Sequence, residues 1–184
     1  MNRKLPIALA LSLAFGLAAS AASASNTITV KGELTNTTCN VVGGQGLGVG
    51  TSADFTVTLP TLNTGVFKAP GDTAGRVPFT LSLSGAGCAD DTTVSAHFSP
   101  VAADVDVANG TLKNQDTGSN IRVQFLDGQN NDTPIDLAKY SRLTGVEVAN
   151  NKATLVYAAQ YYSATATATA GAYSSTMEYD IDYN

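Results

Sequence analysis

The feature that most constrains this chain is a repeated alternation of apolar and polar side chains with a period of two residues. That period is typical of β-strands with one buried face, because successive side chains in a strand point to opposite sides. The pattern predicts strands at residues 27–34, 55–59, 77–83, 93–98, 120–126, 155–162 and 176–183.

Turn-forming pairs separate these segments, among them Pro70-Gly71, Asn109-Gly110 and Asp127-Gly128. No long stretch carries an apolar stripe with the helical period of 3.6 residues. Charged residues make up 14% of the chain, too few for a long solvated helix or a coiled coil. We therefore expect an all-β sandwich of the immunoglobulin-like kind.

Two stretches of biased composition are expected to be connections. Residues 43–50 contain five glycines but lack the Lys-Ser/Thr ending and the following helix of a phosphate-binding loop, so a flexible connection is expected. Residues 164–170 alternate Ala and Thr, whose small side chains bury little surface, so an exposed loop is expected.

The N-terminal 24 residues have the organisation of a secretory signal peptide. Arg3 and Lys4 form a basic region, residues 5–19 are apolar, and Ala22-Ser23-Ala24 is a small-residue cleavage site before Ser25. The apolar run is short for a transmembrane helix, and no charged stop-transfer flank follows it. We therefore expect export from the cytoplasm, into a compartment where disulfides persist.

Cys39 and Cys88 are the only cysteines. An isolated pair in an exported protein favours one disulfide, which would close a loop of about 50 residues and contribute about 4 kcal/mol on the chain-entropy model. The alternatives are two free thiols, or a metal or redox pair. Against these, the spacing is far from Cys-x-x-Cys and no histidine lies nearby in the sequence.

Candidate catalytic groups are few. His97 is the single histidine, and Asp90-Asp91 and Asp104-x-Asp106 are carboxylate pairs of the kind that acidic surface loops commonly supply. Residues 127–132 resemble a calcium loop, but Asp132 and Ala138 stand where an EF-hand needs Gly and Glu. We expect no enzyme activity, no metal site and no cofactor. The net charge of −5 also argues against a nucleic-acid partner.

The order of these segments resembles the chaperone–usher pilins of the type 1 fimbrial family, over the whole chain after the signal peptide. The resemblance rests on the strand at residues 27–34 and Cys39, and on a set of later motifs: Val57-x-Leu59-Pro60, Phe79-x-Leu81-x-Leu83 before Cys88, residues 123–127, Tyr157-x-Ala159-x-Tyr161 and Tyr179-x-Ile181-x-Tyr183-Asn184. The chain departs from the family pattern in two turns, at residues 84–87 and at Ala170-Gly171.

The resemblance implies an immunoglobulin-like sandwich that lacks its final strand and is completed by a donor strand from a neighbouring subunit. Residues 25–36 are then an N-terminal donor-strand extension, and residues 37–184 the pilin domain. Within the extension, Ile28, Val30 and Leu34 would enter the groove of the next subunit, and Gly32 would face a constriction. An unpaired sheet edge beside an open core is suited to such strand addition.

The implied partners are neighbouring pilin subunits, in a homo- or hetero-polymer, a periplasmic chaperone and an outer-membrane usher. The C-terminal strand, with Tyr179, Ile181, Tyr183 and Asn184, would dock on the chaperone, where the carboxylate of Asn184 would meet a basic anchor. The function implied is that of a structural subunit of an adhesive fimbrium, exported through the periplasm to the cell surface. The alternative is a self-complete secreted β-sandwich that binds a carbohydrate.

Overall fold

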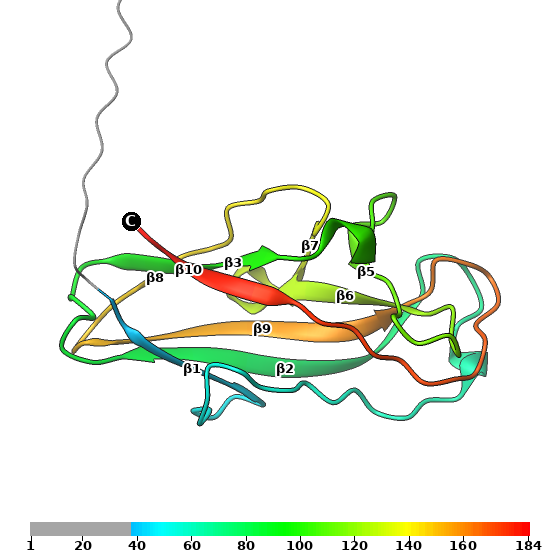
Figure 1. The fold of residues 1–184 in the computed structure, drawn as a ribbon, viewed down its shortest axis with the longest axis horizontal. Coiled ribbons are helices and arrows are strands. Elements are labelled where there is room, and N and C mark those ends of the chain that lie inside the picture. The colour runs from blue at the N-terminus through cyan, green and yellow to red at the C-terminus, as the bar shows by residue number, and fades with distance from the viewer. Residues whose placement is uncertain (1–37) are drawn as a thin grey trace, which may run out of the picture. The chain divides into compact units, whose positions relative to one another are not determined.

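The computed structural model describes residues 38–184, which belong to one structural unit (Figure 1). It contains ten strands and three short 3-10 helices, η1 (Thr64–Val66), η2 (Ala102–Asp104) and η3 (Gly128–Asn130). The strands are β1 (Asn40–Gln45), β2 (Thr73–Ser84), β3 (Thr93–Ser99), β4 (Val105–Asp106), β5 (Thr111–Leu112), β6 (Arg122–Asp127), β7 (Thr133–Ile135), β8 (Val146–Glu147), β9 (Lys152–Tyr162) and β10 (Glu178–Tyr183). The expected strand at residues 27–34 lies outside the described residues.

The larger sheet is antiparallel and is built around two long strands, β2 and β9. Its strand order is β1-β2-β9-β6-β5-β4, and β7 pairs with β6. Both long strands alternate apolar and polar side chains as predicted, although Thr80 and Ser82 of β2 are buried as well. On β9, for instance, Ala153, Leu155, Tyr157 and Ala159 are buried at every second position. Period-two patterning therefore fixes which face of this sheet covers the core.

The smaller sheet has the order β10-β3-β8, so β10 lies at its edge (Figure 1). β10 pairs along its whole length with β3, from Glu178 opposite Ser99 to Tyr183 opposite Val94. On its other side no strand pairs with β10 in the described part of the chain. β10 therefore presents a free backbone edge.

The two sheets face each other across an aromatic core. Phe98 of β3 lies 5.2 Å from Phe125 of β6 and 5.1 Å from Tyr157 of β9, measured between ring centroids. The hydroxyl of Tyr157 also accepts a hydrogen bond from the backbone N–H of Ala96, 3.2 Å away. Edge-to-face packing of this kind adds to the free energy gained from burial. The all-β sandwich expected from the sequence is confirmed.

The predicted disulfide is present. Cys39 precedes β1 and bonds to Cys88, which follows β2 after a turn, at a sequence separation of 49 residues. Both cysteines are buried in the core. The bridge fastens the start of β1 to the end of β2, its strand partner in the described part of the chain.

Two expectations about local structure were wrong. Residues 55–59 are extended, as their alternation predicts, but they pair with no strand within the described residues. Residues 43–45, expected in a flexible connection, instead belong to β1 and pair with β2. Backbone pairing with a long neighbouring strand outweighs the weak strand propensity of Gly43 and Gly44. Residues 164–170 do form a loop, as expected.

Candidate functional site

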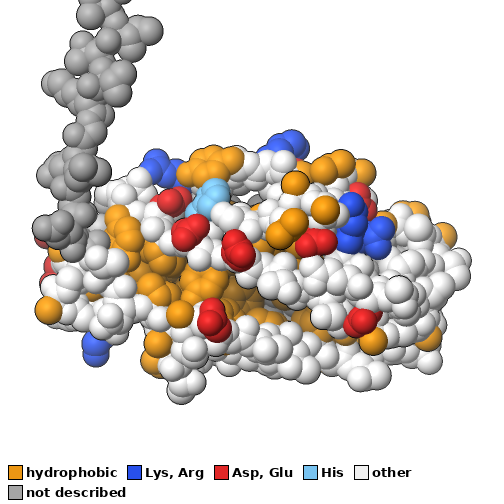
Figure 2. Space-filling view, viewed as in Figure 1, with side chains coloured by type: hydrophobic (Ala, Val, Ile, Leu, Met, Phe, Trp, Pro, Cys, Tyr) orange, Lys and Arg blue, Asp and Glu red, His pale blue; other side chains and the backbone are white. Residues whose placement is uncertain are grey.

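The surface carries an open groove of about 520 Å³. It lies between two extended segments that belong to no sheet, residues 55–59 (the first wall) and residues 173–177 (the second wall). Its floor comes from the larger sheet and is formed by Leu112, Val123, Phe125, Ala159 and Tyr161. Figure 2 shows hydrophobic side chains exposed in a hollow on the face that carries β10.

The first wall has the geometry of a strand without a partner. Phe55, Val57 and Leu59 are half-buried against the core, whereas Thr56 and Thr58 are exposed. The backbone N–H of Thr58 donates to the side-chain carbonyl of Gln45, at 2.8 Å. That single side-chain contact replaces a backbone ladder, so the edge of this segment is available to another strand.

The second wall leads directly into β10 and continues its alternation. Tyr173, Ser175 and Met177 are half-buried, and Ser174 and Thr176 are exposed. Directly after β10, Asn184 and Thr93 exchange both backbone hydrogen bonds, which sets the register of the strand pair. Because bonded pairs alternate in an antiparallel ladder, the backbone groups of Tyr179, Ile181 and Tyr183 point away from β3.

At the β10 end of the groove, two tyrosines of β10 contact residues on the opposite side. Tyr179 donates a hydrogen bond from its hydroxyl to the carbonyl of Ala53, at 2.7 Å, and its ring meets that of Phe55. The hydroxyl of Tyr183 accepts from the backbone N–H of Cys39 at 3.2 Å. The groove is therefore open along the second wall, whereas beside β10 the side chains of Tyr179 and Tyr183 reach across to the other side.

The tyrosines beside the floor of the groove lie in partly apolar surroundings. Burial raises the pKa of Tyr173 and of Tyr161, whose rings meet at right angles, with centroids 6.2 Å apart. Burial also raises the pKa of Tyr179, and the nearby carboxylate of Asp54 raises it further. Since burial disfavours the charged form of a phenol, these shifts indicate surroundings that suit apolar side chains.

The structure brings the predicted docking residues together on one strand. Tyr179, Ile181 and Tyr183 share the inward face of β10 and are half-buried. Asn184 follows the strand, pairs with Thr93 and accepts a hydrogen bond on its side chain from Arg142. The predicted donor residues Ile28, Val30, Gly32 and Leu34 lie outside the described residues.

The sequence did not reveal the two walls, or that Tyr161 lies on the floor of the groove and Tyr173 on its second wall. The alternation at residues 55–59 and its stop at Pro60 were visible, but a sequence pattern does not show whether a strand has a partner. Tyr161 was placed on a strand face without a role, and Tyr173 was not singled out. Tyr161 and Tyr173 meet in the groove because β9 pairs with β6 and because the loop before β10 follows the path it does.

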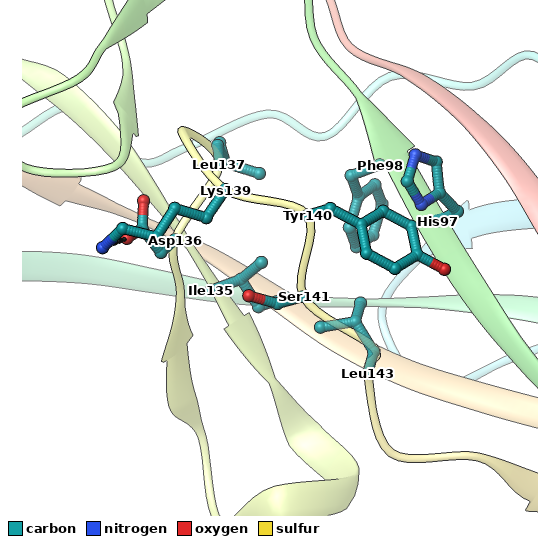
Figure 3. Close-up of a pocket in the computed structure, with 9 residues that line it drawn as sticks. All are labelled: His97, Phe98, Ile135, Asp136, Leu137, Lys139, Tyr140, Ser141 and Leu143. Atoms are coloured by element: carbon teal, nitrogen blue, oxygen red, sulfur yellow. Dashed lines mark hydrogen bonds and ion pairs between the residues drawn. The ribbon is translucent and has the colours of Figure 1, made fainter. Parts of the chain in front are cut away.

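The candidate catalytic residues do not form a site. His97 stacks on Tyr140, with ring centroids 4.8 Å apart, beside a cavity of about 20 Å³ (Figure 3). That cavity has room for about one water molecule. Asp106 pairs with Arg122, and Asp104 accepts from Gln115. Within residues 38–184 we find no cluster of metal-ligating side chains and no helix long and apolar enough to span a membrane.

Comparison with known proteins adds independent information. A family model described as "Fimbrial protein" matches residues 28–184. The major fimbrial subunit SMF-1 of Stenotrophomonas maltophilia is 34% identical over 168 residues, covering 86% of this chain and 92% of the relative. The F17 fimbrial protein of Escherichia coli is 35% identical over 164 residues, covering 85% and 86%.

Solved structures show the same fold at lower identity. A subunit of a chaperone–usher pilus superposes with a TM-score of 0.59 at 16% identity, covering 87% of this chain and 96% of that one. The P pilus rod subunit PapA superposes with a TM-score of 0.58 at 17% identity, covering 79% and 99%.

Proposed function

This chain belongs to the fimbrial protein family, and we propose that it enters its fimbrium by donor-strand exchange. It is a structural subunit of a cell-surface fimbrium and polymerises with other pilin subunits. In the proposed step, the groove between the two walls accepts the N-terminal strand of a neighbouring subunit. The observation that carries the proposal is the groove itself, with an apolar floor and a free backbone edge on either side.

The groove suits a β-strand better than it suits a compact ligand. It is long and open, and its two sides offer backbone groups that make no ladder hydrogen bonds in the described part of the chain. A strand laid between them forms hydrogen bonds that each contribute about 0.5–1.5 kcal/mol. It also covers apolar surface that would otherwise stay exposed to water.

The proposed occupant is the segment of residues 25–36 from the next subunit. Ile28, Val30 and Leu34 alternate with polar residues, and burial of each contributes about 1.5–3 kcal/mol. Gly32 stands between Val30 and Leu34 on the same face. A residue without a side chain suits a place where the groove narrows.

The route to the fimbrium is proposed from the N-terminal signal and from the free edge of β10. Residues 1–24 direct export to the periplasm and are then removed. A periplasmic chaperone pairs with β10 through the edge that carries Tyr179, Ile181 and Tyr183, and delivers the subunit to an outer-membrane usher. We propose no catalytic role, in keeping with a family of structural subunits.

Deletion of residues 25–34 tests the proposal. The deleted subunit should fold, retain its disulfide and co-purify with its chaperone, but it should not form homopolymers. The matched control replaces Thr29 and Lys31 by Ala, which changes the polar face of the segment and leaves Ile28, Val30 and Leu34 in place. This control should polymerise normally. Fibres of normal yield from the deleted subunit would rule out residues 25–34 as the donor.

A further inference from the structure

The second wall belongs to no sheet, so contacts other than a strand ladder must fix its backbone. Residues 172–177 pair with no strand in the described part of the chain, and β10 begins only at Glu178. A segment held only by its own backbone would sample many conformations, at a cost of about 1–2 kcal/mol per residue fixed. Something outside the wall therefore fixes it.

The side chain of Asn114 provides that support. Its amide nitrogen donates to the carbonyl of Ala172 at 2.8 Å, and its amide oxygen accepts from the N–H of Ser174 at 2.9 Å. The same nitrogen donates to the carbonyl of Ser119 at 3.0 Å, and the same oxygen accepts from the N–H of Asp116 at 3.0 Å. The amide is thus fully hydrogen-bonded and joins its own loop to the wall.

The hydrogen bonds from Asn114 to the wall have the spacing of those that a neighbouring parallel strand would make. In a parallel sheet, one residue bonds the carbonyl before and the N–H after the residue opposite it. Asn114 does the same on either side of Tyr173 with its side-chain amide. The N–H of Gln115 adds a bond to the carbonyl of Ser174, at 2.8 Å. An amide side chain carries its donor and its acceptor on two separate atoms of one planar group, as the backbone amide does.

Tyr173 is the wall residue that this arrangement orients. Its hydroxyl lies 3.3 Å from the carbonyl of Leu112 and 3.4 Å from that of Lys113, and its ring contacts Tyr161 on the floor. Asn114 lies directly after Leu112, a floor residue, and Lys113 in sequence. The bonds of Asn114 therefore determine where Tyr173, and with it the open part of the groove, stands relative to the floor.

We infer that Asn114 is a positioning residue that holds the second wall in place for the incoming donor strand. This inference rests on the proposed donor-strand function. Before insertion, the amide of Asn114 is the wall's substitute for a neighbouring strand. After insertion, the donor strand adds ladder bonds on the opposite edge of the wall, so the wall depends less on Asn114. Asn114 acts on the rate of insertion rather than on the lifetime of the finished complex.

The first measurement follows binding of a fluorescein-labelled peptide of residues 25–36 to the exported chain by stopped-flow anisotropy. Asn114→Ala should lower the association rate constant about tenfold, as expected for the loss of two hydrogen bonds to the wall. Its dissociation rate constant should change less than about twofold. Asn114→Asp keeps the acceptor and loses the donor, so it should fall between wild type and Asn114→Ala.

Asn109→Ala is the matched control. Asn109 is an exposed asparagine that bonds to Asp106 and Tyr162, away from the groove. This variant should bind the peptide at the wild-type rate. An equal loss in Asn109→Ala, or an effect of Asn114→Ala confined to dissociation, would overturn the inference. So would wild-type association by Asn114→Ala.

The second measurement does not depend on a donor strand. Amide hydrogen exchange of the free subunit should be about tenfold faster over residues 172–177 in Asn114→Ala than in wild type, with β9 unchanged. Unchanged exchange over the wall would overturn the positioning role. If instead the wild-type chain fails to bind the peptide while wall exchange responds to Asn114→Ala, then the donor-strand proposal is wrong and the positioning role stands.

Discussion

The ring of Phe55 meets the ring of Tyr179 edge to face, with centroids 6.3 Å apart, and this contact joins the first wall to β10. Phe55 also lies 5.8 Å from Phe79 on β2. One aromatic side chain therefore connects the larger sheet, the first wall and the edge of the smaller sheet. A donor strand that extends along β10 has to separate Phe55 from Tyr179, whereas one that stops at the second wall does not.

Gly43 makes room for that ring, so Gly43→Ala should disturb the groove. A Cβ at this position would stand 2.1 Å from Phe55, whereas a Cβ at Gly48 meets nothing within 4 Å. We expect Gly43→Ala to reduce the free energy of unfolding by about 1–3 kcal/mol, typical of overpacking, and to weaken binding of the donor peptide. Gly48→Ala, the control, should retain wild-type peptide affinity. Urea unfolding and peptide titration measure the two effects, and equal peptide affinity in both variants would contradict the account.

Removal of the disulfide should destabilise the subunit strongly. Cys39 and Cys88 close a loop over a sequence separation of 49 residues, so the chain-entropy model gives a loss of about 4 kcal/mol for the double replacement by Ala. Urea unfolding of the double variant, beside wild type with and without reductant, measures this loss. A reductant that leaves the unfolding midpoint of the wild type unchanged would contradict the prediction.

Stability should fall at alkaline pH because of Tyr157. Burial raises the pKa of this phenol from 10.0 to about 12. The folded state therefore holds the proton more tightly than the unfolded state, so the associated stability is full below pH 10. It is lost as the pH rises from 10 to 12, by about 2–3 kcal/mol.

The check is the free energy of unfolding of wild type and Tyr157→Phe between pH 9 and 12. Tyr157→Phe leaves the N–H of Ala96 without its acceptor, so it should be less stable at pH 9 by about 1–3 kcal/mol. Its stability should nevertheless fall less steeply than that of wild type. Other alkaline titrations are common to both proteins. Parallel curves over the whole range would show that Tyr157 does not carry the effect.

Gly32→Leu should block polymer growth and leave export intact. On the proposed donor face, Gly32 is the only residue without a side chain among Ile28, Val30 and Leu34. A leucine there would meet the narrow part of a groove that accepts its neighbours. Fibre yield and the periplasmic level of the subunit are measured together, with Lys31→Leu on the opposite face as the control. Normal fibre yield from Gly32→Leu would show that Gly32 does not face a constriction in the groove.

Much of this fold was predictable because period-two alternation directly reflects which face of a strand is buried. The long strands β2 and β9 show many repeats of the pattern, and the predictions at residues 77–83 and 155–162 lie within them. The short strands β4, β5, β7 and β8 contain two or three residues each, which is too few to reveal a period.

The groove was harder to predict than the strands that surround it. Residues 55–59 carry the same pattern as a paired strand, and only the three-dimensional arrangement shows that their edge is free. The support from Asn114 was also invisible, because it joins residues about 60 positions apart through a side chain. A pattern within one segment carries no information about such contacts.

The most direct test of strand exchange is amide hydrogen exchange measured on assembled fimbriae and on the free subunit. If the groove accepts a donor strand, exchange over residues 55–59 and 173–183 should slow by at least about 100-fold on assembly, as new ladder bonds form. Exchange over β2 and β9, which are already paired, should change little. Equal amide exchange rates over both walls in the fimbria and in the free subunit would contradict the account.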